Sequence, residues 1–282
     1  KVVWSKTKEC YVVVSEVAKN NSGKKKVLAS VLATLAIMGA GAQMGTPVQA
    51  GTDLDKKVNI SPSGTNIGTY PTANKASDNS VVVGYGNDTK TNVKGSGHVA
   101  YGFGNTATED TTTAIGGGNK ATGPAATAVG SFNEATGRNT VAVGNVAKAN
   151  NTDNIAIGTY SEALTNGQDA YALAMGSYSK ANAHMAVGIG ALANATGTES
   201  TAVGAGSKAS AKNSQAFGAR NTASGQNASA FGYKNKVTGD NSTALGTGNT
   251  IDGASVAGAV AVGNQNNASG DRAIAIGETN TS

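Results

Sequence analysis

Hydrophobic residues recur through most of the chain in short groups, each made of a small residue, an apolar residue and a glycine. The glycines of these groups are Gly84, Gly102, Gly116, Gly130, Gly144, Gly158, Gly176, Gly188, Gly204, Gly218, Gly232, Gly246, Gly263 and Gly277. Eight of their thirteen spacings equal fourteen residues, which is too short for a helix pair. Fourteen residues do hold two short strands and two turns, so the pattern predicts the coils of an all-β parallel solenoid.

Each group reads as the end of a strand with alternating faces, as in Val141-Ala142-Val143-Gly144. We predict that the bulky residue before each glycine points into the coil. The alanine before it then points outward, and alanine is a poor strand former in solvent. We therefore expect these alanines to pack against a neighbouring subunit around a symmetry axis. They are Ala114, Ala128, Ala142, Ala156, Ala202, Ala216, Ala230, Ala244 and Ala275.

A second strand is predicted after each glycine, because a small or apolar residue recurs five positions later, as at Ala121, Ala135 and Ala193. Charged residues such as Lys120 and Glu134 precede it in successive repeats. Mixed charges at equivalent positions indicate a solvated outer strand. The glycines are expected at turns that need a positive φ or a close backbone approach.

The first fifty residues have a different character. They contain seven lysines against two acids, whereas residues 51–282 balance fifteen bases with fifteen acids. The excess charge of +5 therefore does not indicate nucleic-acid binding by the remainder. Lys24-Lys25-Lys26, an apolar run over 27–38 and small residues up to Ala50 predict a secretory signal peptide over 24–50, cleaved between Ala50 and Gly51.

Residues 1–22 precede this basic cluster and resemble the extended signal peptide region of large type V secreted proteins of Gram-negative bacteria. The matching residues are Trp4, Ser5, Tyr11, 14–16 and 18–19. The resemblance implies passage through the inner membrane and periplasm to the cell surface. The one cysteine, Cys10, falls in this region, so the mature part needs no disulfide in the oxidising periplasm.

The repeats themselves resemble the head repeat of trimeric autotransporter adhesins, typified by the Yersinia adhesin. Three segments, 79–87, 139–147 and 241–249, carry the likeness. It implies a left-handed parallel β-roll, a homotrimer, and attachment to host matrix, host cells or other bacteria at the outer membrane surface. The adhesive motif would comprise Asn79, Ser80, Val83, Gly84, Asn139, Thr140, Val143, Gly144, Asn241, Ser242, Leu245 and Gly246.

The predicted organisation is therefore an extended signal peptide over 1–50, an N-terminal segment over 51–78 with a degenerate repeat at Ile67-Gly68, and a head array over 79–282. Insertions near 88–97, 164–170 and 254–259 should bulge from the roll, because the repeat lengthens there. We expect the gene to continue beyond Ser282 into a coiled-coil stalk and a membrane anchor.

Other functions remain as alternatives. A two-partner secreted haemagglutinin also uses the extended leader, although its coils need about twenty residues. A β-helical enzyme acting on polysaccharide would need a cluster of acidic or basic residues, and the sequence suggests no catalysis, cofactor or metal. His98 and His184 lie in different repeats and are expected at the surface. Phe132, Tyr160, Tyr178 and Tyr233 follow motif glycines and could fill corners or form an exposed aromatic row.

Overall fold

The computed structural model describes residues 2–5, 10–13, 58–61, 64–67, 80–89, 97–167, 170–253 and 256–282. The chain divides into two units, 1–60 and 61–282. In the first unit, β1 (Val2–Ser5) and β2 (Cys10–Val13) form an antiparallel pair with Trp4 opposite Tyr11. The predicted basic, apolar and cleavage regions over 24–50, with Gly51, lie outside the described residues.

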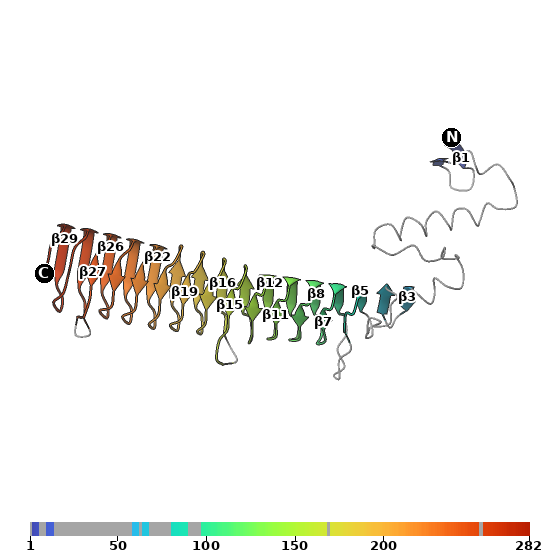
Figure 1. Cartoon of the computed structure of the whole chain (residues 1–282), viewed down its shortest axis with the longest axis horizontal. Coiled ribbons are helices and arrows are strands. Elements are labelled where there is room, and N and C mark those ends of the chain that lie inside the picture. Colours follow the sequence, from blue (N-terminus) through green and yellow to red (C-terminus); the bar gives the residue numbers. More distant parts are fainter. Residues whose placement is uncertain are drawn as a thin grey trace. The chain divides into compact units, whose positions relative to one another are not determined.

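The second unit is a β-solenoid built from two sheets (Figure 1). The described residues form a sixteen-strand sheet, here the long-strand sheet, and an eleven-strand sheet, the short-strand sheet. The long-strand sheet contains β3 (Val58–Ser61), β4 (Gly64–Ile67), β5 (Val81–Tyr85), β6 (Val99–Phe103), β8 (Thr113–Gly117), β10 (Thr127–Ser131), β12 (Val141–Asn145), β14 (Ile155–Ile157), β16 (Leu173–Met175), β18 (Val187–Ile189), β20 (Thr201–Val203), β22 (Gln215–Ala219), β24 (Ser229–Tyr233), β26 (Thr243–Thr247), β28 (Val260–Asn264) and β29 (Ile274–Glu278). The short-strand sheet contains β7 (Thr106–Ala107), β9 (Lys120–Ala121), β11 (Glu134–Ala135), β13 (Lys148–Ala149), β15 (Glu162–Ala163), β17 (Lys180–Ala181), β19 (Asn194–Ala195), β21 (Lys208–Ala209), β23 (Thr222–Ala223), β25 (Lys236–Val237) and β27 (Thr250–Ile251).

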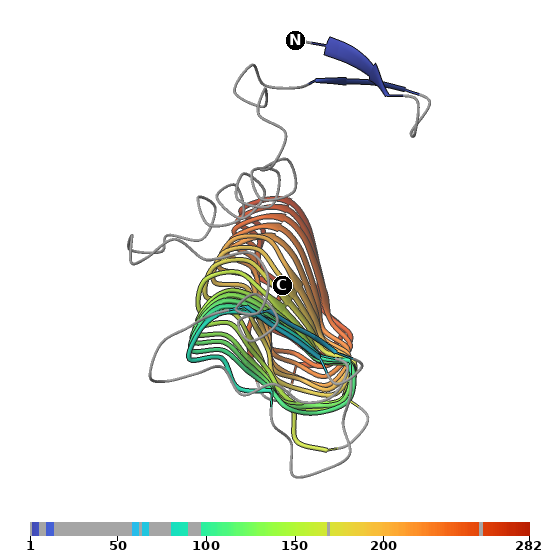
Figure 2. The same ribbon diagram turned by 90° about the vertical axis from the view of Figure 1, so that its right-hand side faces the viewer.

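Every coil lies directly on the next, because equivalent residues pair in parallel. Ala128 pairs with Ala114 on one side and Ala142 on the other, while Ala135 pairs with Ala121 and Ala149. Viewed along the stack, the coils superimpose as a flattened ring (Figure 2). Neighbouring coils are therefore about 4.8 Å apart, the spacing of paired strands. The all-β parallel solenoid with coils of about fourteen residues is confirmed.

The phase of one repeat was predicted wrongly. Gly188 pairs with Ala174 and Ala202, so it occupies the alanine position, and Gly190 is the glycine that ends this strand. The spacings from Gly176 to Gly190 and on to Gly204 are therefore fourteen residues each, instead of twelve and sixteen. The second small residue of this coil is accordingly Ala195 in β19, and Ala193 belongs to the preceding turn.

The interior of the roll is lined almost entirely with alanine. Among the described residues, the buried hydrophobic side chains that are not alanine are those of Val82, Val237, Ile251 and Val256. Ala128 of the long-strand sheet and Ala135 of the short-strand sheet are both 0% exposed, and most coils repeat this pair in the same core. The two sheets approach closely enough that a methyl group from each fills the space between them.

Buried asparagines line one edge of this interior, three residues after the motif glycine. Asn119 is typical: its Nδ2 donates to Asn105 Oδ1 (3.0 Å), to the Ile115 carbonyl (2.9 Å) and to the Gly130 carbonyl (2.8 Å). Its Oδ1 accepts from the backbone N–H and the Nδ2 of Asn133 (3.0 and 2.9 Å). These bonds form an asparagine ladder in two blocks, Asn87, Asn105, Asn119 and Asn133, then Asn221, Asn235, Asn249 and Asn266. Each amide joins its own coil to both neighbours.

The motif glycines have the expected positive φ and close backbone approach, but they lie in or at the end of the strands of the long-strand sheet and not at the predicted turns. Gly116 has φ +118°, and a Cβ there would lie 1.9 Å from the Gly130 carbonyl oxygen of the next coil. An L side chain therefore fits neither the conformation nor the space. The same approach between successive glycines recurs along the stack, which explains why this position admits no other residue.

The three insertions leave the strand register intact. Val81 pairs with Val99, Ile155 with Leu173, and Thr243 with Val260 across them. The extra residues are therefore accommodated outside the ladder. Parts of each insertion, 90–96, 168–169 and 254–255, lie outside the described residues. The degenerate repeat predicted at Ile67 corresponds to β4, where Ile67 pairs with Val83 of β5.

Candidate functional site

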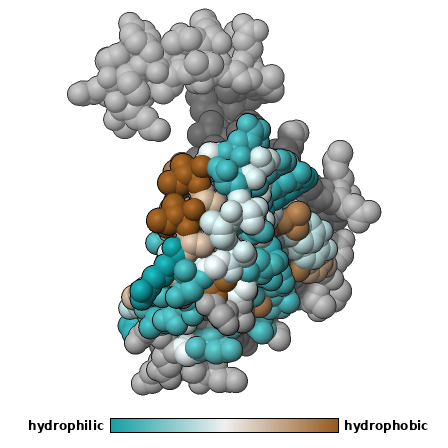
Figure 3. Space-filling model, turned by 90° about the vertical axis from the view of Figure 1, so that its left-hand side faces the viewer, coloured by the Kyte–Doolittle hydropathy of each residue, from teal (hydrophilic) through white to brown (hydrophobic). Residues whose placement is uncertain are grey.

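The outer face of the long-strand sheet carries a row of apolar side chains along the roll, one before each motif glycine, beside a mixed row that includes Thr127, Gln215 and Ser229. Because alanine faces inward, the residues on either side of it face outward. Large apolar side chains among them are substantially exposed in the single chain: Val81 46%, Tyr101 55%, Ile115 36%, Met175 40%, Leu245 50%, Ile274 63% and Ile276 63%. Phe217 and Phe231 stack on this face in adjacent coils, with ring centroids 5.3 Å apart. Seen from the C-terminal end, apolar residues gather on one flank (Figure 3).

The predicted orientation of these strands was therefore inverted. The nine alanines expected at a subunit interface, Ala114, Ala128, Ala142, Ala156, Ala202, Ala216, Ala230, Ala244 and Ala275, are all buried inside the coil, at 0 to 2% exposure. The bulky residue before each glycine points outward. The physical reason is the width of the coil, because the sheets lie so close that alanine fills most core positions and Ile251 is the largest fully buried side chain among the described residues.

The outer face of the short-strand sheet is charged, as predicted. Lysine and glutamate alternate along it from Lys120 to Lys180, one residue per coil. Lys180 Nζ lies 2.7 Å from Glu162 Oε2, and Lys148 Nζ lies 4.0 Å from Glu134 Oε2. Exposed ion pairs of this kind contribute at most about 1 kcal/mol each, so they reduce repulsion between stacked coils more than they stabilise the fold.

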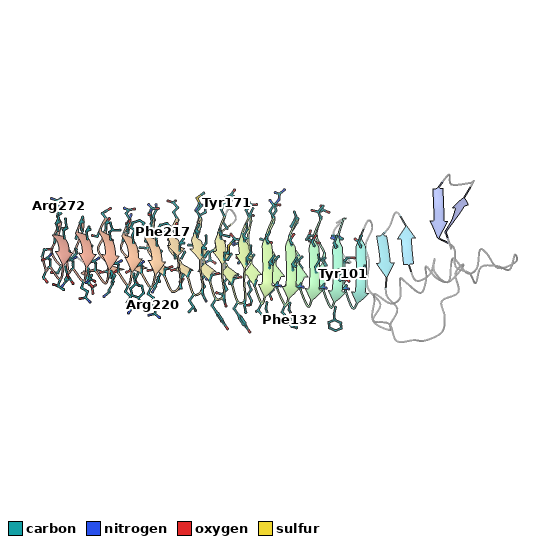
Figure 4. All side chains as sticks on the ribbon, turned by 90° about the horizontal axis from the view of Figure 1, so that it is seen from above. Tyr101, Phe132, Tyr171, Phe217, Arg220 and Arg272 are labelled. Carbon is teal, nitrogen blue, oxygen red and sulfur yellow. The ribbon has the colours of Figure 1, made fainter. Side chains whose placement is uncertain are left out.

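Two corners join the sheets, and each holds one residue with positive φ per coil. The first corner, two residues after the motif glycine, carries Phe132, Val146, Tyr160, Tyr178 and Leu192 in five successive coils, with φ between 53° and 60°. Other coils use glycine there, such as Gly104 and Gly206. The second corner carries Tyr171 and Arg272 at the opposite edge from Phe132 and Arg220 (Figure 4).

The aromatic residues of the first corner project into solvent. Phe132 is 64% exposed, Tyr160 44% and Tyr178 51%, and the rings of Tyr160 and Tyr178 stack with centroids 5.1 Å apart. Phe132, Tyr160 and Tyr178 therefore form an exposed aromatic row and do not fill space at the corners. Tyr233 does not belong to it, because it lies one position earlier, at the end of β24.

Tyr233 belongs instead to a basic neighbourhood. The Nζ of Lys234 lies 5.0 Å from the centre of the Tyr233 ring. A hydrogen bond with Lys234, together with the positive charges of Lys234 and Arg220, holds the pKa of the Tyr233 hydroxyl below its ordinary value. One coil away, hydrogen bonds from Lys236 and Thr238 lower the pKa of Asp252. In both cases a neighbouring lysine favours the ionised form of the acid.

The residues of the predicted adhesive motif divide between interior and surface. Ser80, Thr140 and Ser242 are buried at 0 to 1% exposure, so they cannot contact a ligand as expected. Such hydroxyls form hydrogen bonds within the coil, as Thr140 Oγ1 does when it donates to the Gly137 carbonyl at 2.7 Å. Asn139 and Asn241 are exposed at the second corner, Leu245 is half-exposed, and Val83 and Val143 are intermediate on the apolar face. Asn79 lies outside the described residues, and Gly84, Gly144 and Gly246 lie in β5, β12 and β26, where each approaches the backbone of the next coil closely.

The histidines do not form a site together. His98 was expected at the surface but is fully buried, with Nδ1 2.8 Å from Thr112 Oγ1. His184 is partly buried and lies edge-on to Tyr171, with ring centroids 6.5 Å apart. The described residues contain no group of three or more His, Cys, Asp or Glu able to hold a metal ion. They also contain no helix long and apolar enough to cross a membrane.

Comparison with known protein families finds two matches. The YadA head domain repeat matches residues 107–133, 135–161, 185–206, 195–221, 223–249 and 257–277. The extended signal peptide of the type V secretion system matches residues 1–43. The chain belongs to the trimeric autotransporter adhesins. No curated protein was found to match it.

Both predicted resemblances are thereby confirmed. The adhesin carries a type V secretion signal and a head of stacked repeats, and head repeats of this family are typically non-enzymatic. The head repeat favours this family over the two-partner haemagglutinins, which share the extended leader.

Two features of the adhesin, one buried and one at the surface, were not predicted. The asparagine ladder could have been found, because asparagine recurs three residues after the glycine in Asn105, Asn119 and Asn133. The total charge of residues 51–282 is balanced and does not indicate the local excess of bases around Arg220 and Lys234. Counting charge coil by coil would have found it.

Proposed function

We propose that the adhesin assembles as a homotrimer in which the outer face of the long-strand sheet meets its copies around the axis. The exposed apolar side chains on that face carry this proposal. Monomeric soluble proteins rarely expose an apolar strip that runs the length of the molecule, whereas such strips are usual at permanent interfaces. Three strips meeting at one axis bury each other, which gives a closed cyclic assembly.

In this arrangement the short-strand sheet and the corners face outward and make contact with ligands. We propose that the head attaches a Gram-negative cell to host matrix, host cells or other bacteria without catalysis. Binding through many coils on three chains raises the effective concentration of each weak contact, so avidity replaces a deep pocket.

Light scattering on paired variants tests the assembly. Val143→Glu places a charge on the long-strand outer face, and Lys148→Glu makes a charge change in the same coil on the short-strand outer face. We expect Val143→Glu to lower the particle mass from three chains toward one, because burying an unpaired carboxylate is costly. Lys148→Glu should leave the mass unchanged. Equal masses for both variants, or a monomer for the unaltered chain, would contradict the arrangement.

Attachment is tested separately on cells that display the head. Cells displaying the unaltered chain should adhere to coated matrix proteins, to cultured host cells or to one another more strongly than cells lacking it. Val143→Glu should reduce adhesion far more than threefold, because avidity is lost together with the trimer. Equal adhesion by cells with and without the chain would overturn the adhesive function.

A further inference from the structure

Positive charge is concentrated in one zone of the otherwise neutral head. Residues 200–239 contain five bases, Lys208, Lys212, Arg220, Lys234 and Lys236, and no acid. The stretches on either side, 98–199 and 240–282, contain more acids than bases. Residues 51–282 are neutral in total, but an excess of positive charge is concentrated in residues 200–239.

Four of these bases form one patch, here the basic patch, made of Lys208, Arg220, Lys234 and Lys236. Arg220 and Lys234 occupy the first corner in adjacent coils, with φ 58° and 55°. Lys208 and Lys236 lie on the outer face of the short-strand sheet, next to that corner and two coils apart. Two coil steps are about 10 Å, so the four charges span roughly that distance along the roll.

The basic patch is exposed and largely unopposed. All four side chains are exposed, and the acid beside them is Asp252, which pairs with Lys236. This contrasts with the lysines of earlier coils, where Lys148 and Lys180 each lie beside a glutamate. Arg220 and Lys234 have positive φ, a strained conformation for these residues, whereas the neighbouring coils have Gly206 and Gly248 at this position. The patch therefore carries its charges at a cost in backbone strain.

We propose that the basic patch binds an acidic polysaccharide, a polymer that carries sulfate and carboxylate groups at regular intervals. This proposal deepens the adhesive function and rests on display of the head at the cell surface. The guanidinium of Arg220 suits bidentate contact with sulfate or carboxylate, and the lysines supply flexible charges on either side. Charges spread over successive coils suit a polymer chain lying across them rather than one small anion.

The surroundings favour polysaccharide over nucleic acid. Single-stranded nucleic acids bind on exposed aromatic faces where bases stack. At the patch, Lys234 already lies over the ring of Tyr233. The type V secretion signal also directs the head out of the cell, where acidic polysaccharides cover cells and matrix.

Chromatography on immobilised heparin tests this proposal with the purified secreted chain, from which the basic leader over 1–50 has been removed. The unaltered chain should bind at low salt and elute as salt rises, because the contacts are ionic. The double variant Arg220→Gln/Lys234→Gln should elute at lower salt and bind about tenfold more weakly, with each charge contributing a factor of roughly three. Arg220→Gly/Lys234→Gly removes the same charges with the residue that other coils use, so it should fold and lose the same affinity.

The matched control is Lys148→Gln/Lys180→Gln, which changes the total charge equally but removes lysines that face glutamates. It should elute with the unaltered chain. Equal weakening by both double variants would show that only net charge matters, and failure of the unaltered chain to bind would also overturn the proposal. Equal binding to single-stranded DNA of the same charge would overturn the choice of polysaccharide. If cells still adhere and the trimer persists in any of these cases, the proposed adhesin function stands.

Discussion

Replacing Asn119 by alanine tests how much the asparagine ladder contributes to stability. The side chain is 1% exposed and makes hydrogen bonds in three coils. The substitution removes this partner from the carbonyls of Ile115 and Gly130 and from the backbone N–H and Nδ2 of Asn133, whereas the Asn105 Oδ1 keeps the backbone N–H of residue 119 at 3.0 Å. An unsatisfied buried group costs about 1 to 3 kcal/mol. A water in the vacated space can satisfy some of these four groups.

We therefore expect a loss of about 3 kcal/mol, confined to the coils that touch Asn119, since each coil contacts only its neighbours. That free energy corresponds to a roughly hundredfold increase in local opening. Native-state hydrogen exchange measures it directly, because the backbone amide of Asn133 donates to Asn119 Oδ1. The variant should still fold, since Ala147 occupies the equivalent position and its N–H bonds to Asn133 Oδ1 at 2.8 Å.

Ser161→Ala is the matched control, because Ser161 occupies the same position in a coil outside the ladder. It is fully buried, but its Oγ donates a single hydrogen bond, to the Gly158 carbonyl at 3.1 Å. We expect a loss of about 1 kcal/mol there. Similar exchange rates at the affected amides of the two variants would refute the idea that the ladder binds the coils together.

Three further predictions concern the core, a corner and the basic patch. Ala128→Leu should destabilise the head by about 3 kcal/mol or more in thermal or denaturant unfolding, because Ala128 is fully buried between the alanines of the coils on either side; an unchanged midpoint would contradict the narrow core. Val146→Gly should raise stability by about 1 kcal/mol, because a β-branched residue is strained at φ 59°; a lower melting temperature would argue that the valine side chain contributes packing that outweighs this strain. Lys234→Gln should raise the pKa of Tyr233 toward its ordinary value in an ultraviolet or NMR titration, since Lys234 supplies the main lowering interaction; an unmoved titration would exclude that contact.

The sequence was sufficient to predict the stacking of coils. A fourteen-residue period leaves few alternatives to two strands per coil, and glycine at φ near +120° is the expected solution where backbones approach closely. Alternation alone could not decide which face is the interior, because a strand with period two has two equivalent faces. The second strand resolves this ambiguity, because alanine recurs there in most coils, as at Ala135, and two rows of alanine can only face one another across a thin core.

The phase error at Gly188 has a similar cause. In Val187-Gly188-Ile189-Gly190 both glycines fit the triplet, and both are followed five residues later by alanine. Pairing with neighbouring coils settles the phase, because it requires the same residue to stack on Ala174 and Ala202. A local motif is ambiguous wherever glycine replaces alanine, and only the register of the whole array resolves it.

The head keeps its interior constant while its corners change along the length. Coils with Ala147, Ser161, Ser179, Ala193 and Ser207 lack the asparagine ladder, and four of them carry the apolar corners Val146, Tyr160, Tyr178 and Leu192. Beyond them the ladder resumes at Asn221 and Asn235, beside the bases Arg220 and Lys234. Corner side chains lie outside the core, so exchanging them leaves the stacking of alanine and glycine unchanged. Side chains at the corners and on the short-strand face can therefore differ from coil to coil and set binding specificity. The alanines and glycines that define the repeat are needed for stacking and cannot vary in this way.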